Sequence, residues 1–144
     1  MNKKRDFFHI PSLLIEKTLQ QTPFQGKHLL EPFRAYAKEH RIPINILEDK
    51  AVSNEPEVHI NAADLWLCLE GEAIFICGGT LQGPHPKQNH SGTFDRDELV
   101  GTGIAGGKEV VMRKGDWLWI PAGCPHRHRA VGVARFMIIK VPHK

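Results

Sequence analysis

The spacing of hydrophobic positions changes near residue 42 and divides the chain into two parts. Before this point, apolar residues recur at helical spacing, which predicts one helix after Pro11 and a second over roughly residues 29–39. After it, short runs rich in β-branched and aromatic residues alternate with turns marked by glycine. The predicted strands cover residues 44–47, 65–69, 73–77, 109–112, 117–120 and 134–141. Strands that follow one another without intervening helices are typical of an antiparallel sandwich or barrel.

This pattern predicts an all-β fold in which residues 1–41 form a helical segment packed on a barrel of residues 42–144. Residues 81–94 are polar and rich in proline, glycine and histidine, so an exposed loop is predicted there. The composition leaves open whether this loop is simply solvated or folds over the mouth of the barrel as a lid.

Composition excludes several classes of function. The net charge of +3 comes from basic residues that are mostly scattered along the 144-residue chain, so no nucleic-acid partner is expected. No apolar run approaches the ~20 residues that a membrane span needs, and no secretory signal is expected at the start. The three cysteines form no C-x-x-C pair, which argues against a disulfide framework and makes the cytoplasm the expected location.

Nine histidines are many for a chain of this size, and their spacing singles out His59 first. Glu57 and His59 are two positions apart, so on a strand their side chains share a face. Asp64 lies at an odd offset from His59, but a short loop at residues 61–63 would bring it to the same cavity. An imidazole and one or two converging carboxylates are suitable ligands for a divalent metal.

The strand that Asp64 would open places two more side chains on the same face, those of Trp66 and Cys68. Both are candidates for a pocket lining or for support of the ligands. The simpler alternative is that Trp66 packs in the core or at its rim and that Cys68 is a buried small hydrophobe.

A second group of residues surrounds His126. Gly115 supplies a turn, an apolar run forms a strand, and residues 121–123 reverse the chain. His126 then stands at the start of the returning strand, and His128 shares its face. His126 is a predicted metal ligand, and either Glu57 or His128 would complete the set.

Each of these residues also has a simpler structural role. His59 and His126 could be hydrogen-bonded or solvated histidines, and Asp64 could cap the turn before it by bonding its own backbone. Glu57 could be a loop carboxylate that precedes a strand.

The segment around His126 resembles the second motif of the cupin superfamily, G-x5-P-x-G-x2-H, at Gly115, Pro121, Gly123 and His126. The asparagine that follows in that motif is replaced by Ala130.

The first segment resembles the other cupin motif, H-x-H-x4-E-x6-G, with two substitutions. Glu57 stands at the first histidine position and Asp64 at the glutamate position, seven residues before Gly71. This variant is similar to the first motif of YhcH/YiaL-type cupin-like proteins. The resemblance covers approximately residues 58–141.

The resemblance implies a cupin double-stranded β-helix, an RmlC-like jelly-roll barrel with a metal at its mouth, and frequent homodimers. The metal would be Zn, Fe, Mn or Ni, bound by Glu57, His59, Asp64 and His126. The superfamily contains enzymes and plain binding proteins, so the fold alone does not choose between them.

Three functions therefore stay open: a metalloenzyme that acts on a small organic acid or sugar-like substrate, a non-catalytic small-molecule-binding or regulatory cupin, and a metal-free structural module. The extra negative charge of Glu57, compared with the usual imidazole, is expected to lower the Lewis acidity of the metal. It should also disfavour direct binding of anionic substrates to it.

Overall fold

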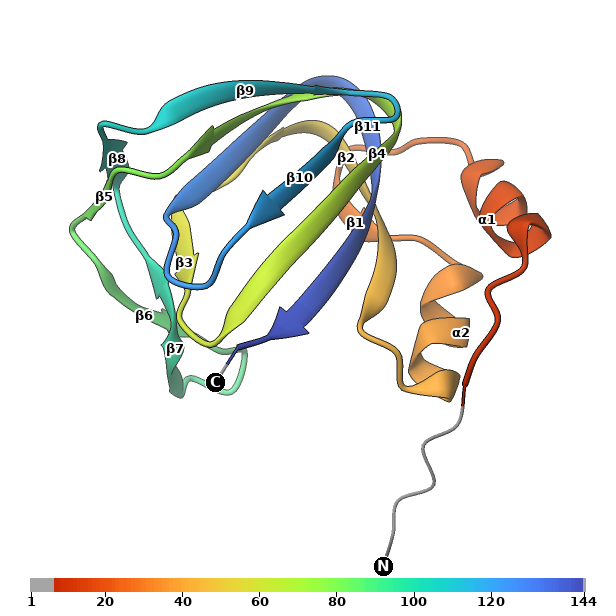
Figure 1. Ribbon diagram of the computed structural model, residues 1–144, viewed down its shortest axis with the longest axis horizontal. Helices are drawn as coiled ribbons and strands as arrows, with labels where there is room; N and C mark the ends of the chain where they lie inside the picture. The colour runs from red at the N-terminus through yellow and green to blue at the C-terminus, as the bar shows by residue number, and fades with distance from the viewer. Residues whose placement is uncertain (1–6, 144) are drawn as a thin grey trace, which may run out of the picture.

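The computed structural model describes residues 7–143, which form a β-barrel with two short helices on one side (Figure 1). The helices are α1 (Ser12–Leu19) and α2 (Phe33–His40). The strands are β1 (Gly26–Leu29), β2 (Ile44–Ser53), β3 (Glu57–His59), β4 (Ala62–Cys77), β5 (Thr80–Gln82), β6 (His85–Gln88), β7 (Phe94–Val100), β8 (Gly103–Ala105), β9 (Lys108–Arg113), β10 (Trp117–Ile120) and β11 (His126–Pro142).

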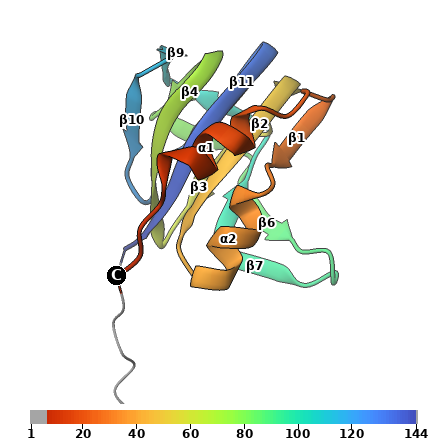
Figure 2. The ribbon, with the colours of Figure 1, turned by 90° about the vertical axis from the view of Figure 1, so that its right-hand side faces the viewer.

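The long strand β11 organises the barrel. It pairs antiparallel with β2 on one side and with β4 on the other, and β1 extends the sheet beyond β2 (Figure 2). Strand β4 pairs with β10 along its first half and with β9 along its second half. Strands β3, β7 and β6 continue from the start of β11 and lie behind this layer in Figure 2. The prediction of an all-β jelly roll with a small N-terminal helical segment is confirmed.

The sequence predicted two separate strands on either side of Gly71, but β4 runs through this glycine. Gly71 has a φ of +70°, and a Cβ there would lie 2.0 Å from the carbonyl oxygen of Val133. The opposing strand β11 has an irregular register between Arg129 and Ala134. A glycine at this position therefore lets β4 bend past the bulge without a break.

Two hydrophobic cores follow from the alternation of side chains along the strands. The barrel interior is filled by inward-facing residues of β2, β4, β9, β10 and β11, including Leu47, Trp66, Cys68, Phe75, Met112, Ile120 and Phe136. A second core lies between the helices and the outer face of β2, where Ile46 meets Leu30, Phe33 and Ala37. Helix α2 ends at Arg41, which adopts the left-handed conformation (φ 53°) that commonly terminates helices.

The N-terminal segment is not purely helical, in contrast to the prediction. Residues 26–29 form β1, which pairs with β2 from Gly26–Lys50 to Leu29–Leu47, and the second helix begins only at Phe33. Four residues with alternating burial are too few for their period to be separated from helical spacing.

The predicted loop at residues 81–94 also contains regular structure. Strand β6 pairs with β7, and the end of β5 pairs with β8. The β6 residues are exposed or half-buried throughout, so they lack the apolar alternation by which a strand is recognised in sequence.

Arg135 joins the N-terminal segment to the barrel. Its guanidinium is buried and lies 2.7 Å from a carboxylate oxygen of Glu48, which is also buried. The same guanidinium donates to the carbonyl oxygens of Leu19 and Gln21, just after α1. The guanidinium therefore ties the end of α1 to β2 through one buried ion pair.

Within the described residues, no helix has the length and apolar character to cross a membrane.

Candidate metal centre

Four side chains that the sequence proposed as metal ligands lie together at one end of the barrel. Glu57 and His59 come from β3, Asp64 from the start of β4 and His126 from the first position of β11. His126 pairs directly with Glu57 in the register of these strands, and Gly123 N–H donates to the carbonyl oxygen of His59. The turn before β11 therefore fixes the two motifs against each other.

The distances between the ligand atoms fit a single metal ion. His59 Nε2 lies 3.7 Å from Glu57 Oε1 and 3.3 Å from Asp64 Oδ2. His126 Nε2 lies 3.5 Å from Glu57 Oε1 and 3.8 Å from Asp64 Oδ2. Bonds of ~2.0–2.2 Å to one zinc ion place neighbouring ligand atoms roughly 3–4 Å apart, and these four of the six pairs fall in this range. The ligand atoms of Glu57, His59 and His126 all lie within 4.8 Å of one another, and Asp64 adjoins this group through the two histidines.

Both histidines are held in the tautomer that metal binding needs. His59 Nδ1 bonds the Glu98 carboxylate, and His126 Nδ1 lies 3.0 Å from the carbonyl oxygen of Cys124. Since both partners are acceptors, each Nδ1 carries a proton and each Nε2 points toward the centre, where it would bind a metal in its unprotonated form.

Two buried polar atoms at the centre lack a hydrogen-bond partner within the described chain, His126 Nε2 and Asp64 Oδ2. Buried polar atoms are nearly always satisfied, so an unsatisfied lone pair next to an unsatisfied carboxylate oxygen calls for an explanation. A bound cation would satisfy both, and the donor set therefore fits a metal.

Sequence reasoning missed two residues that contact this group, Glu98 and Lys140. Lys140 Nζ lies 2.6 Å from Asp64 Oδ1 and 3.2 Å from His59 Nε2. Lys140 is the direct neighbour of Asp64 across the β4–β11 pair, and Glu98 is the neighbour of His59 across the β3–β7 pair. Only the strand register could have indicated either contact.

The charges of the group shift its pKa values in opposite directions. Burial raises the pKa of Glu57, but the close contact with His126 and nearby positive charges outweigh it and lower the pKa to about 2. Burial likewise raises the pKa of Asp64, but the close contact with His59 and the charge of Lys140 bring it to about 2. Burial lowers the pKa of His59, whereas its bonds with Asp64 and Glu98 raise it to about 9.

These values predict that metal affinity increases with pH up to about pH 9. Below that pH, His59 of the metal-free protein carries a proton that a metal must displace, whereas the two carboxylates are already ionised. His59 alone should then strengthen zinc binding about tenfold for each pH unit. Competition titrations with a chelator at pH 6, 7 and 8 measure this slope, and an affinity that is constant over these values would contradict it.

The other three predicted site residues, Trp66, Cys68 and His128, have roles outside the ligand group. Trp66 is buried in the barrel core and also lines the cavity described below. Cys68 is buried in the core, and its thiol points to the carbonyl oxygens of Glu70 and Gly71.

His128, the sequence's alternative to Glu57, stands apart from the four ligands. Its Nε2 lies 2.5 Å from the buried Asp49 carboxylate, and its ring stacks on Phe75 at 4.9 Å. The structure therefore places Glu57, rather than His128, next to His59 and His126.

A cavity of about 800 Å³ opens at the metal centre. Glu57, His59, Asp64 and Trp66 line it, together with Lys140. Residues 87, 89 and 90, which belong to the segment considered as a lid, line it from β6 and the turn after it. This volume is sufficient for a small organic ligand.

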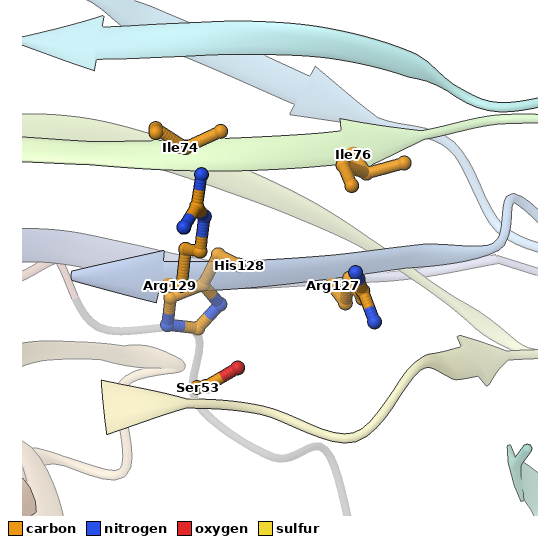
Figure 3. Close-up of a pocket in the computed structure, with 6 residues that line it drawn as sticks. All are labelled: Ser53, Ile74, Ile76, Arg127, His128 and Arg129. Carbon is orange, nitrogen blue, oxygen red and sulfur yellow. The ribbon is translucent and has the colours of Figure 1, made fainter. Parts of the chain in front are cut away.

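A second pocket, between Arg127, Arg129, Ile74 and Ser53, is far smaller (Figure 3). Its volume of about 10 Å³ is the size of a single water site. Arg127 and Arg129 alternate with the inward-facing histidines of β11, and they do not line the large cavity.

No protein-family model matches the sequence, and no curated protein matches it. Solved structures do resemble it. An oxalate oxidase structure gives a TM-score of 0.54 with 18% identity and covers 98% of this chain and 62% of that chain. Oxalate oxidase with the substrate analogue glycolate gives 0.54 with 18% identity, over 99% of this chain and 63% of that chain. The CENP-C cupin domain of Drosophila melanogaster gives a TM-score of 0.50 with 14% identity and covers 83% of this chain and 70% of that chain.

The chain thus spans less than two thirds of the length of the oxalate oxidases it resembles. At these identities the likeness concerns the fold. It agrees with the glycine, proline and histidine spacing of the second motif, which forms the turn before β11. The protein is therefore a cupin in its fold.

Proposed function

We propose that this protein binds one divalent transition metal through Glu57, His59, Asp64 and His126 and acts with it on a small organic acid. The observation that supports this most directly is the convergence of two imidazole Nε2 atoms and two carboxylate oxygens at the inner end of an open cavity. Two of these four atoms are buried without another partner.

The donor set favours Zn, Fe, Mn or Ni, because it combines neutral imidazoles with carboxylates and has no thiolate. When bound, such a metal polarises a carbonyl group or binds oxygen. The chain itself orients the imidazoles through Glu98 and the Cys124 carbonyl. Such outer hydrogen bonds typically tune the affinity of a site 10- to 100-fold.

The cavity supports a small acid as the ligand. It is lined by three lysines, Lys27, Lys87 and Lys140, and by apolar side chains such as Leu47 and Ile138. Four carboxylates also line it, of which Glu57 and Asp64 are the proposed ligands and Glu98 bonds His59, which leaves Asp95. A structural neighbour with the same fold, oxalate oxidase, has been solved with glycolate.

Non-catalytic binding of the same ligand is the second candidate, and Glu57 is the observation that favours it. Two carboxylates in the ligand set neutralise a divalent ion, which lowers its capacity to polarise a substrate. Any intrinsic turnover should then be modest.

The decisive experiment has two stages. Elemental analysis of purified protein first measures whether a metal is present at about one per chain. The metal-free protein is then loaded anaerobically with Fe(II), and oxygen uptake is followed with glycolate, keto acids, catechols and sugar acids. Rapid uptake that depends on one substrate and is lost in His59→Ala would establish an oxidase or oxygenase. Zinc retained from expression without any uptake would favour the non-redox or binding role, and no metal at all would refute the proposal.

We further propose that the protein forms a homodimer in the cytoplasm. Strand β10 pairs only with β4 among the described strands, and it exposes Trp117 (59%) and Trp119 (53%). Exposed aromatic residues on an edge strand are typical of a contact surface. All three cysteines are free, as expected in a reducing compartment. Light scattering at micromolar concentration tests the dimer, and a monomeric mass would contradict it.

A further inference from the structure

The ammonium group of Lys140 lies inside the group of metal ligands. Its Nζ is 2.6 Å from Asp64 Oδ1 and 3.2 Å from His59 Nε2, the atom that would bind the metal. Both contacts hold because Lys140 and Asp64 face each other across neighbouring strands. Lys140 therefore supplies the positive charge that neutralises Asp64 in the absence of a metal.

A metal and this ammonium cannot both keep the contact with His59 Nε2, although Asp64 offers them different oxygens: Oδ1 bonds Lys140, whereas Oδ2 faces the two histidines. A metal bound to His59 Nε2 at ~2.1 Å would lie within a few ångströms of Nζ, where two cations repel strongly. Asp64 is almost fully buried and held at the start of β4, whereas Lys140 is 45% exposed and has a flexible four-carbon side chain. Lys140 is thus the group that must move.

The cavity is where Lys140 can move. Its side chain lines the same space as Glu57, His59 and Trp66, and Ile138 precedes it on the same face of β11. The same space is lined by the carboxylates of Glu57, Asp64, Asp95 and Glu98, of which Glu57 and Asp64 are the proposed ligands and Glu98 bonds His59. An ammonium released from His59 can there donate a charge-assisted hydrogen bond to an anionic group of a ligand.

We infer that Lys140 is the residue that binds the carboxylate of an anionic ligand, and that it becomes available when the metal takes its place at His59 Nε2. This inference rests on the proposed metal site and names the residue that selects the ligand's charge. It also explains how a metal already neutralised by two carboxylates can act on an anion. Lys140, rather than the metal, binds the negatively charged group of that ligand. Metal binding and anion binding are then coupled through one side chain.

The first part of the test measures zinc affinity in the wild type, in Lys140→Gln and in Lys87→Gln. Lys87 lines the same cavity from β6, so its replacement removes the same charge without removing the contact to Asp64. Zinc should bind Lys140→Gln roughly fivefold more tightly than the wild type, because no ammonium then competes with the metal beside His59 Nε2. Lys87→Gln should change zinc affinity much less.

The second part titrates the zinc-loaded proteins with glycolate and with the uncharged analogue glycolamide by calorimetry. Glycolate should bind the wild type and lose roughly tenfold in affinity in Lys140→Gln, because a hydrogen bond to a charged group is lost. Glycolamide should bind more weakly than glycolate to the wild type and be insensitive to the substitution. Circular dichroism confirms that each variant is folded.

The outcomes separate this inference from the proposed function. One outcome is that zinc binds the wild type and Lys140→Gln with the same affinity, and that glycolate also binds both equally well. In that case the inference about Lys140 is wrong and the metal site stands. Tighter zinc binding with unchanged glycolate affinity would overturn the role of Lys140 in ligand binding. If zinc binds neither protein, both proposals are refuted.

Discussion

His126→Ala is expected to remove metal binding almost completely. His126 provides one of the two imidazole nitrogens, and its buried Nε2 lies 3.5 Å from Glu57 Oε1 and 3.8 Å from Asp64 Oδ2. Since even the loss of an outer hydrogen bond costs 10- to 100-fold in metal affinity, the loss of a ligand should cost more than about a hundredfold. Elemental analysis after dialysis and a chelator competition measure the loss.

Two further variants make this result interpretable. His90→Ala removes an imidazole that lines the same cavity but lies outside the ligand group, so its metal content should equal that of the wild type. His126→Gln retains most of the buried volume, which separates loss of the ligand from loss of packing. A protein that keeps one tightly bound metal per chain in both His126 variants would show that the metal is held elsewhere.

Arg135→Ala is expected to destabilise the protein by about 3–5 kcal/mol. The guanidinium is 3% exposed, its partner Glu48 is completely buried, and the variant leaves that carboxylate without its charge partner. It also removes the donors to the carbonyl oxygens of Leu19 and Gln21, so the end of α1 keeps only its hydrophobic packing against the sheet. Urea unfolding of the purified variant measures the change in the free energy of unfolding.

Arg113→Ala is the matched control, because Arg113 forms an ion pair with Glu72 at the surface, 3.7 Å apart and largely exposed. Exposed pairs contribute little, so this variant should stay within about 0.5 kcal/mol of the wild type. If Arg135→Ala were as mild as Arg113→Ala, the buried ion pair would not hold the N-terminal segment.

The sequence determined the parts of this protein that depend on local chain geometry. A strand alternates its side chains between two faces, so the spacing of Glu57 and His59 was sufficient to place them on one face. The turn at residues 121–123 reverses the chain after β10 and therefore puts His126 at the start of β11. The β-rich pattern after residue 42 in the same way predicted a barrel.

Weakly patterned segments escaped prediction because their structure depends on partners elsewhere in the chain. Strand β1 is four residues long and forms against β2, and β6 has no buried face that would mark it as a strand. Both are held by backbone hydrogen bonds to a neighbouring strand, and every residue except proline has both the donor and the acceptor for these bonds.

Only the tertiary structure decided which residues surround the ligands. Glu98 stands behind His59 and Lys140 stands opposite Asp64 because of the register of β7 with β3 and of β11 with β4. His128 shares a face with His126, yet the buried Asp49 on β2 binds it and leaves the ligand position to Glu57. Register is set by how all the strands bury their apolar faces together, so no short stretch of sequence contains it.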